Sequence, residues 1–344
     1  MAIKTVLVTG ASGFLASYVI AELLSNDYTV HGTIRSLAKQ DQIRAQHADA
    51  DGRLKLFEVK DLVVGDGLEA AMTGCDAVLH TASPYQLSVQ DPIKDFIEPA
   101  VEGTLTVLKT AHALGIKRVG ITSSFAAVTN FEKGGPWRDY TYTEADWNPV
   151  TLEQATEPGR PGAFVYSASK TFADRAAHDF GTAHPDMVIT TLNPPMIYSS
   201  PRQAITSKAE VNTSSNAIYS LINGEKDRDA PWNRLPLFCS TEDVALAHRR
   251  VLEVDEDKVR GRRFLLCGGS FTWEDAIRHL ATTRPELKPR LPKLTQHDPD
   301  ADKPIAKLDC TPAQQVLGIT QFKEWKEILE KTIDRLVEIE QQFK

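Results

Sequence analysis

The stretch Val6-Leu-Val-Thr-Gly-Ala-Ser-Gly-Phe-Leu-Ala16 predicts a strand that runs into a helix. Residues 3–8 form an apolar, β-branched run of strand length, and apolar side chains recur at helical spacing from residue 14 to residue 24. Gly10 permits the backbone angles of a tight turn, and Gly13 permits close approach of another backbone segment. The free N–H groups of the helix therefore open onto a bare surface that suits a pyrophosphate. The usual dinucleotide fingerprint has a third glycine where this chain has Ala16, and a glycine-rich turn without a ligand is the alternative interpretation.

The composition indicates a globular chain without affinity for polyanions. The 344 residues are 42% hydrophobic, enough to bury a sizeable core in one large or two modest domains. The formal net charge is −7 and no block of Lys and Arg occurs, so nucleic acid is not an expected partner. No apolar run could cross a bilayer, and a strand from residue 3 leaves no room for a signal peptide, so we expect a cytoplasmic protein without a membrane partner. The four cysteines are widely spaced, which favours reduced thiols over a metal site or disulfides.

Strand and helix signals alternate through the first half of the chain. Beyond the opening unit, strands are expected at residues 28–34, 54–59, 77–81, 118–122, 187–192 and 262–267. The longest helical separator is expected at residues 91–114, with a kink at Pro99. This alternation predicts an α/β fold with a doubly wound parallel sheet of the Rossmann type, whose ligand lies across the carboxyl ends of the strands. We expect the NADP(H)-binding domain to comprise residues 1–193 and 237–267, and a smaller interleaved C-terminal lobe for substrate to comprise residues 194–236 and 268–344.

The end of the second expected strand distinguishes between the two nicotinamide cofactors. A site for NAD(H) usually has an acid there for the ribose 2′-hydroxyl, whereas this chain reads Gly32-Thr-Ile-Arg-Ser36, with Lys39 one helical turn further. Arg35 and Lys39 suit a 2′-phosphate, because Arg presents a planar fork and Lys a second point charge. We therefore expect NADPH/NADP+, with a solvated helix start as the alternative interpretation. Asp61, after the third strand, can either accept a hydrogen bond from an adenine amino group or serve as an ordinary turn residue.

The sequence Tyr166-Ser-Ala-Ser-Lys170 opens a helix that is expected at residues 164–180. A spacing of four residues places the phenol and the ammonium group on one helical face. A unit charge about 4 Å away is worth roughly 4 kcal/mol at an effective dielectric of 20, which brings the pKa of a tyrosine toward the working pH of a general acid. The pattern alone is a weak signal, but here it follows five expected strands, a glycine-rich first turn and a strand that ends in Ser123 and Ser124.

Taken together, these motifs resemble the extended short-chain dehydrogenases/reductases, in the branch of the dihydroflavonol reductases, cinnamoyl-CoA reductases and fungal carbonyl or methylglyoxal reductases. The resemblance covers nearly the whole chain and is nearest to the fungal NADPH-dependent carbonyl and methylglyoxal (aldehyde) reductases, which also tend to carry Ala in the third glycine position. It is carried by Thr9-Gly-Ala-Ser-Gly-Phe-Leu-Ala16, Gly32-Thr-Ile-Arg-Ser36, Leu79-His-Thr-Ala-Ser-Pro84, Pro99-Ala-Val-Glu-Gly-Thr104, Thr122-Ser-Ser124, Trp147-Asn-Pro149, Tyr166-x-x-x-Lys170 and Asn193-Pro194. The chain departs from the family at Tyr198-Ser-Ser-Pro201, which is one residue longer than the family's Gly-Pro turn.

The resemblance implies a role for each site residue. It implies that the pyrophosphate is cradled by Gly10, Ser12, Gly13, Phe14 and Leu15, the 2′-phosphate by Arg35 and Lys39, and the adenine by Asp61 and Leu62. Thr81, Ala82, Tyr166, Lys170, Pro194, Ile197 and Ser214 complete the expected cofactor-binding set, toward the nicotinamide half.

The reaction implied is the reduction of aldehydes, ketones or ketoesters to alcohols, with NADPH as the hydride donor. Tyr166 would protonate the carbonyl oxygen, Lys170 would lower the pKa of the tyrosine and bind the nicotinamide ribose, and Ser124 would hydrogen-bond the carbonyl. Ser124 is preferred to Ser123 on the family resemblance, and alternation along a strand points the two serines to opposite faces. The expected partner is a small carbonyl substrate. We expect the protein to be a monomer or homodimer and to bind no metal.

Two other classes of function fit the same fold. An NAD-dependent nucleotide-sugar epimerase or dehydratase would have an acid near position 35. A non-catalytic protein that senses NADP would tend to lack the pairing of Tyr166 with Lys170.

Overall fold

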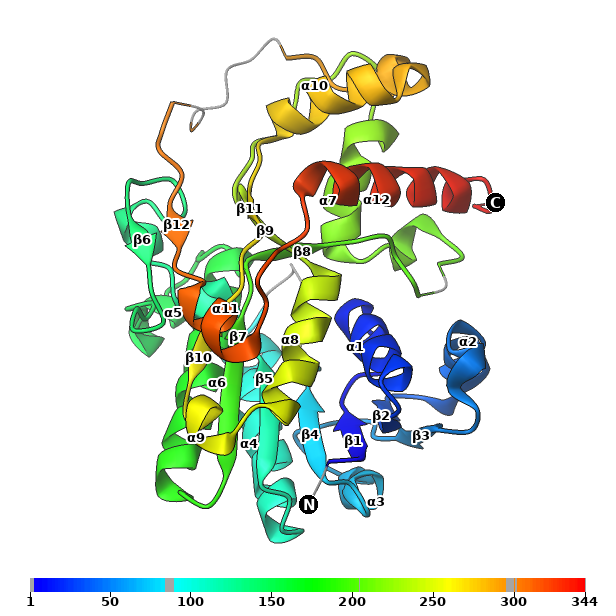
Figure 1. The fold of residues 1–344 in the computed structure, drawn as a ribbon. Coiled ribbons are helices and arrows are strands. Elements are labelled where there is room, and N and C mark those ends of the chain that lie inside the picture. Colours follow the sequence, from blue (N-terminus) through cyan, green and yellow to red (C-terminus); the bar gives the residue numbers. More distant parts are fainter. Residues whose placement is uncertain (1–2, 84–89, 204, 295–299, 301, 344) are drawn as a thin grey trace.

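The computed structural model describes residues 3–83, 90–203, 205–294, 300 and 302–343 (Figure 1). Within these ranges, seven parallel strands form one sheet in the order β10-β7-β5-β4-β1-β2-β3. Their bounds are β1 Thr5–Val8, β2 Thr29–Ile34, β3 Leu54–Glu58, β4 Ala77–His80, β5 Arg118–Thr122, β7 Val188–Asn193 and β10 Arg263–Leu265. The order reverses direction at β1, so the first strand and its glycine turn lie in the middle of the sheet. The α/β fold with a doubly wound parallel sheet is thereby confirmed.

Helices cover both faces of this sheet. The larger α-helices are α1 Phe14–Ser25, α4 Glu98–Ala113, α6 Gly162–Ala183, α7 Thr213–Asn223, α8 Thr241–Glu253, α10 Trp273–Thr283 and α12 Trp325–Glu340. The shorter ones are α2 Gln40–Gln46, α3 Leu68–Met72, α5 Leu152–Thr156, α9 Glu256–Val259 and α11 Thr311–Leu317. In β1, Val6 and Val8 pack with α1 and α8, whereas Leu7 packs with α3 and α4 on the opposite face. This alternation makes the strands apolar throughout, as a sheet buried on both faces requires.

The second half of the chain adds two small sheets and a separate core. β9 Leu237–Ser240 pairs with β8 Met196–Tyr198 and β11 Gly269–Ser270, and β12 Lys307–Leu308 pairs with β6 Thr141–Tyr142. A second hydrophobic core joins α7, α10 and α12, which lie together at the top of Figure 1. In contrast, α8 and α11 pack into the core of the large sheet. The expected division into a dinucleotide domain and a substrate lobe stays a prediction.

Two sequence expectations need correction at their boundaries. β1 begins at Thr5 rather than at residue 3, because the N–H groups of Lys4 and Thr5 both donate to the Asp76 carboxylate, each at 2.8 Å. β10 ends at Leu265 rather than at residue 267, because the chain then turns to the second sheet, where the Gly268 N–H donates to the Phe238 carbonyl at 2.8 Å.

The expected kink at Pro99 takes a different form. Residues Ile93–Ile97 are π-helical, and Pro99 is among the first two residues of α4, which follows directly. The proline therefore marks a change from π-helical to α-helical winding at a helix start, where its missing N–H is tolerated. Among the described residues, no helix combines the length and apolarity needed to cross a membrane. All four cysteines are free thiols.

Candidate active site

The turn between β1 and α1 has the shape that a pyrophosphate requires. Gly10 has a φ of +72°, and a Cβ there would come within 3.0 Å of the Ala82 Cβ and 3.2 Å of its Cα. A Cβ at Gly13 would approach the Gly10 carbonyl oxygen to 3.1 Å. Gly13 is the N-cap of α1, and neither a capping side chain nor an acid in the first turn covers the helix N-terminus. Its N–H groups and positive dipole end therefore remain available to an anion.

A cavity of about 720 Å³ extends from this turn across the carboxyl ends of β1, β2, β4 and β5. Twelve of the expected site residues line it: Gly10, Ser12, Gly13, Phe14, Leu15, Arg35, Lys39, Asp61, Leu62, Thr81, Ala82 and Lys170. These residues come from five separate segments of the chain. The structure thus brings the phosphate turn, the two cations and the lysine of the Tyr-x-x-x-Lys motif into one cavity.

Arg35 and Lys39 both lie in this cavity and both are exposed. Ser36, between them, caps the 3-10 turn Leu37–Lys39, since its Oγ accepts a hydrogen bond from the Ala38 N–H at 3.3 Å. The two cations therefore flank a fixed turn at the end of β2, and the glycine cradle beside them completes a site that fits a dinucleotide with a 2′-phosphate.

Asp61 is a turn residue that also lines the cavity, and its contact with adenine stays a prediction. One oxygen of its carboxylate accepts the Val63 N–H at 2.8 Å, as in an Asx turn, and the residue also lines the cavity beside Leu62.

A neutral histidine lies beneath the centre of the cavity. Thr9 Oγ1 accepts hydrogen bonds from the N–H groups of Thr81 and Ala82, both at 3.1 Å, so its own proton points to His80 Nδ1 at 2.8 Å. His80 Nε2 then carries the proton and faces Thr104 Oγ1 at 3.5 Å. Burial and, to a smaller extent, the nearby charge of Lys170 together lower the pKa of His80 to about 3. This chain of bonds holds the end of β4 in the shape that passes closely over Gly10.

The two serines after β5 differ in what their hydroxyl groups contact. Ser123 is buried, and its Oγ donates to Asp174 Oδ2 at 2.7 Å. Ser124 is half-buried, and its Oγ accepts the Ala126 N–H at 3.1 Å as the cap of the 3-10 turn Phe125–Ala127. An accepted bond leaves the Ser124 proton available for donation, whereas that of Ser123 is committed.

Lys170 lies on α6, one helical turn before Asp174. It is 7% exposed, and its Nζ donates to the Thr122 carbonyl at 3.1 Å. Burial lowers its pKa to about 8, and the negative charge of Asp174 opposes that lowering. Tyr166 lies one turn before it on α6 and is half-buried.

Five expected site residues lie outside the residues that line the cavity. Tyr166 is on α6, Ser124 follows β5, and Ile197 lies in β8. Pro194 accepts the Phe125 N–H at its carbonyl, and Ser214, in the first turn of α7, accepts the Asn212 side-chain amide. Pro84, quoted for the family resemblance, falls outside the described residues. The roles of all these residues stay predictions.

The cavity also contains residues that the sequence did not single out for the site. His80, Thr104 and Asp174 all line it. Asp174 had a detectable signal, because it extends the spacing of four from Tyr166 and Lys170 by one more helical turn.

Comparisons with known proteins give this geometry a context. The profile of the NAD dependent epimerase/dehydratase family matches residues 6–267. The chain is 35% identical to the ketoreductase azaE of Aspergillus niger over 325 residues, which is 92% of this chain and 93% of the relative. The crystal structure of Gre2 from Candida albicans in complex with NADPH superposes with a TM-score of 0.87 at 29% identity, over 98% of this chain and 99% of that one. The yeast methylglyoxal/isovaleraldehyde reductase Gre2 complexed with NADPH gives a TM-score of 0.85 at 27% identity, over 98% and 100% of the two chains.

Proposed function

The chain belongs to the NAD dependent epimerase/dehydratase family, and we propose that within it this protein is an NADPH-dependent reductase of aldehydes, ketones and ketoesters. The observation that carries the proposal is the single cavity that holds the glycine turn, the cation pair and Lys170. Similarity to a ketoreductase and to two NADPH-complexed Gre2 structures supports it. The protein is an oxidoreductase on this account, and methylglyoxal and branched aliphatic aldehydes are the first substrates to test.

The residues of the cavity would hold the cofactor at three points. Gly10 and Gly13 would let the pyrophosphate approach the N-terminus of α1. Arg35 and Lys39 would hold the 2′-phosphate, and Asp61 and Leu62 would border the adenine. When bound, NADPH supplies the hydride for a carbonyl carbon.

The catalytic roles fall to Tyr166, Lys170 and Ser124. Lys170 is fixed by the Thr122 carbonyl, and its positive charge would favour the tyrosinate form of Tyr166, so that the phenol becomes an effective acid near neutral pH. Ser124 would donate a hydrogen bond from its hydroxyl group to the carbonyl oxygen and so stabilise the negative charge that develops there. Tyr166 would then deliver the proton that completes the alcohol.

The alternative functions find less support in the structure. An exposed Arg35 stands where an NAD-dependent epimerase or dehydratase is expected to have an acid. A non-catalytic NADP sensor has no need of a buried lysine held at the end of β5. We expect a cytoplasmic protein, monomeric or homodimeric.

A parallel assay of NADPH and NADH oxidation at 340 nm tests this function. The carbonyl panel should contain methylglyoxal, isovaleraldehyde, an aromatic ketone and a ketoester. We expect turnover with NADPH strongly preferred, and a loss of at least about 100-fold in kcat for Tyr166→Phe. Tyr140→Phe is the matched control, because Tyr140 is exposed and lies outside the cavity. A Tyr166→Phe variant with the kcat of the wild type would disprove the proposed mechanism. Absence of turnover by the wild type on every carbonyl compound of the panel would disprove the function.

A further inference from the structure

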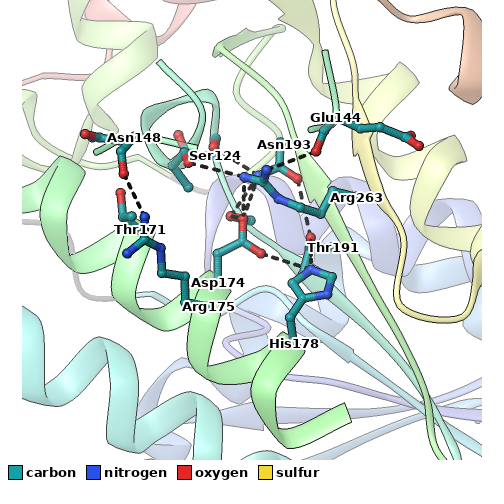
Figure 2. A network of polar contacts seen from close by, with 12 residues as sticks. Ser124, Glu144, Asn148, Thr171, Asp174, Arg175, His178, Thr191, Asn193 and Arg263 are labelled. Carbon is teal, nitrogen blue, oxygen red and sulfur yellow. Dashed lines mark hydrogen bonds and ion pairs between the residues drawn. The ribbon is translucent and has the colours of Figure 1, made fainter. Parts of the chain in front are cut away.

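A buried polar network adjoins the cavity beyond Lys170, and α6 supplies its centre (Figure 2). Tyr166, Lys170, Asp174 and His178 follow one another at intervals of four residues and so form one stripe along α6. The side chain of Asp174 has 0% exposure, and the residue contributes to the cavity wall. A buried charge is costly unless it is paired and hydrogen-bonded, so the partners of Asp174 indicate why it is there.

The carboxylate of Asp174 is held from three strands of the large sheet. Its Oδ2 accepts hydrogen bonds from Ser123 Oγ at 2.7 Å, Asn193 Nδ2 at 2.9 Å and Arg263 Nη2 at 3.2 Å. Its Oδ1 lies 3.4 Å from His178 Nε2. Burial raises the pKa of Asp174, but these contacts outweigh burial, and the pKa lies below its usual value. The carboxylate is therefore a fixed negative charge at all pH values of interest.

Arg263 is itself locked in place. Its guanidinium donates to the carbonyl oxygens of Ala127, Glu144 and Asp146, and its Cζ lies 3.6 Å from the ring centroid of Trp147. Figure 2 shows Arg263 reaching over Asp174 from the side of Asn193. Because Arg263 has so many other partners, it does not need Asp174 for its orientation, and Asp174 gains a rigid neighbour.

Lys170 lies one helical turn before Asp174 on α6, and the charge of Asp174 acts on it. Tyr166 lies one turn before Lys170 on α6, and Lys170 interacts with His80 from β4, which is neutral, with the Thr122 carbonyl from β5, and with Asp174 one turn along α6. Asp174 is thus the one negative charge among these neighbours. Arg263 and His178 contact the carboxylate itself, and the charges of Arg175 and Asp146 act on Arg263.

We propose that Asp174 is a positioning residue for the reduction, which acts through Lys170 by holding a fixed negative charge one helical turn from its ammonium group. The inference rests on the proposed function, because Lys170 matters to the reaction only if Tyr166 is the acid. Asp174 contacts Ser123 and Asn193 rather than the reacting atoms. Its effect is to keep Lys170 protonated, because burial alone would favour the neutral amine.

The test replaces Asp174 by Asn, which keeps the acceptor for Ser123 and removes the charge. The titration of Lys170 is followed by NMR of ε-labelled lysines in the cofactor-free protein, with the signal assigned by its absence in Lys170→Arg. We expect a midpoint of about 8 in the wild type. In Asp174→Asn we expect a midpoint lower by more than about one pH unit, since loss of an opposite charge within a helical turn destabilises the cation. Asp179→Asn removes an exposed carboxylate from the same helix and should leave the midpoint unchanged.

Activity provides the second readout. The alkaline limb of the kcat profile of Asp174→Asn should move to lower pH by the same amount, and kcat at neutral pH should fall at least about twofold, because a smaller fraction of Lys170 is then protonated. The dissociation constant for NADPH should change less than about threefold, because the phosphate contacts are untouched. A purely structural role would leave the Lys170 midpoint and the pH profile where they are.

A second variant covers the case in which Asp174→Asn does not fold. Asp174→Asn combined with Arg263→Gln removes both members of the buried ion pair and leaves no uncompensated charge. It should shift the Lys170 midpoint in the same direction. An unshifted midpoint in either folded variant would overturn the inference even if the wild type reduces carbonyls. A wild type that reduces none would instead refute the proposed function, and the NMR titration would still decide the link between Asp174 and Lys170.

Discussion

Removal of the two cations at the end of β2 should change which nicotinamide cofactor the protein uses. Arg35 and Lys39 are exposed and lie in the same cavity as the glycine turn. A 2′-phosphate carries nearly two negative charges, and one cation about 4 Å away is worth roughly 1 kcal/mol in water and roughly 4 kcal/mol near a protein surface. We take about 2 kcal/mol for the exposed Arg35, which corresponds to roughly 30-fold in kcat/KM.

The assay compares NADPH and NADH in Arg35→Ala, Lys39→Ala and the double variant. Each single change should lower kcat/KM for NADPH by about 10- to 100-fold, and NADH, which lacks the phosphate, should change less than about twofold. Salt should weaken NADPH use by the wild type more than by the double variant, since exposed charges are screened. Arg44→Ala is the matched control, because Arg44 is an exposed cation on α2 outside this cavity. Equal losses with both cofactors, or none with NADPH, would refute the assignment of the 2′-phosphate site.

Two further predictions concern the glycine turn and the response to acid. Gly10→Ala should raise the NADPH dissociation constant at least about tenfold and cost about 1–3 kcal/mol of unfolding free energy, because φ is +72° and Ala82 lies 3.0 Å from the new Cβ. Gly52→Ala is the control: Gly52 has a φ of +77° and open space around it, so the variant should lose stability but keep its affinity for NADPH. A Gly10→Ala protein that binds NADPH with normal affinity would contradict the assignment of the glycine turn to the pyrophosphate. Burial lowers the pKa values of His80, His248 and His47 to about 3, 4 and 4, against 6.5 when unfolded, so the folded state binds fewer protons and loses stability as pH falls below 6.5. Each histidine should change the unfolding free energy, measured by denaturant titration, by about 1.4 kcal/mol per pH unit. His248→Gln should reduce the slope of unfolding free energy against pH by that amount. An unfolding free energy of the wild type that stays constant between pH 6.5 and 4.5 would exclude the effect.

Local patterns predicted the large sheet because each strand carries its own signal. The fifth strand was expected at residues 118–122 and is observed at Arg118–Thr122. The small sheets had no such signal, since β8, β11 and β12 contain two or three residues each. β12 pairs with β6 across nearly half the sequence, and periodicity within a short window contains no information about so distant a partner.

The residues of the candidate site also differ in whether the sequence alone could identify them. Gly10, Arg35 and Lys170 were identifiable because each belongs to a motif that is contiguous in sequence or follows a strand end. Asp174 was not identified, because its meaning depends on Asn193 and Arg263, which approach it only in the folded chain. Its spacing of four from Lys170 is visible in the sequence, but nothing in the sequence shows that the carboxylate is buried.

The contact between Arg263 and Asp174 joins residues 89 positions apart, and it has a consequence for biosynthesis. The glycine turn and the cations at the end of β2 leave the ribosome early, well before β10 is translated. The buried carboxylate on α6 acquires its guanidinium partner only after the last strand of the large sheet has been translated. On a ribosome stalled before residue 263, α6 would therefore already be synthesised while its buried carboxylate still lacked the guanidinium partner.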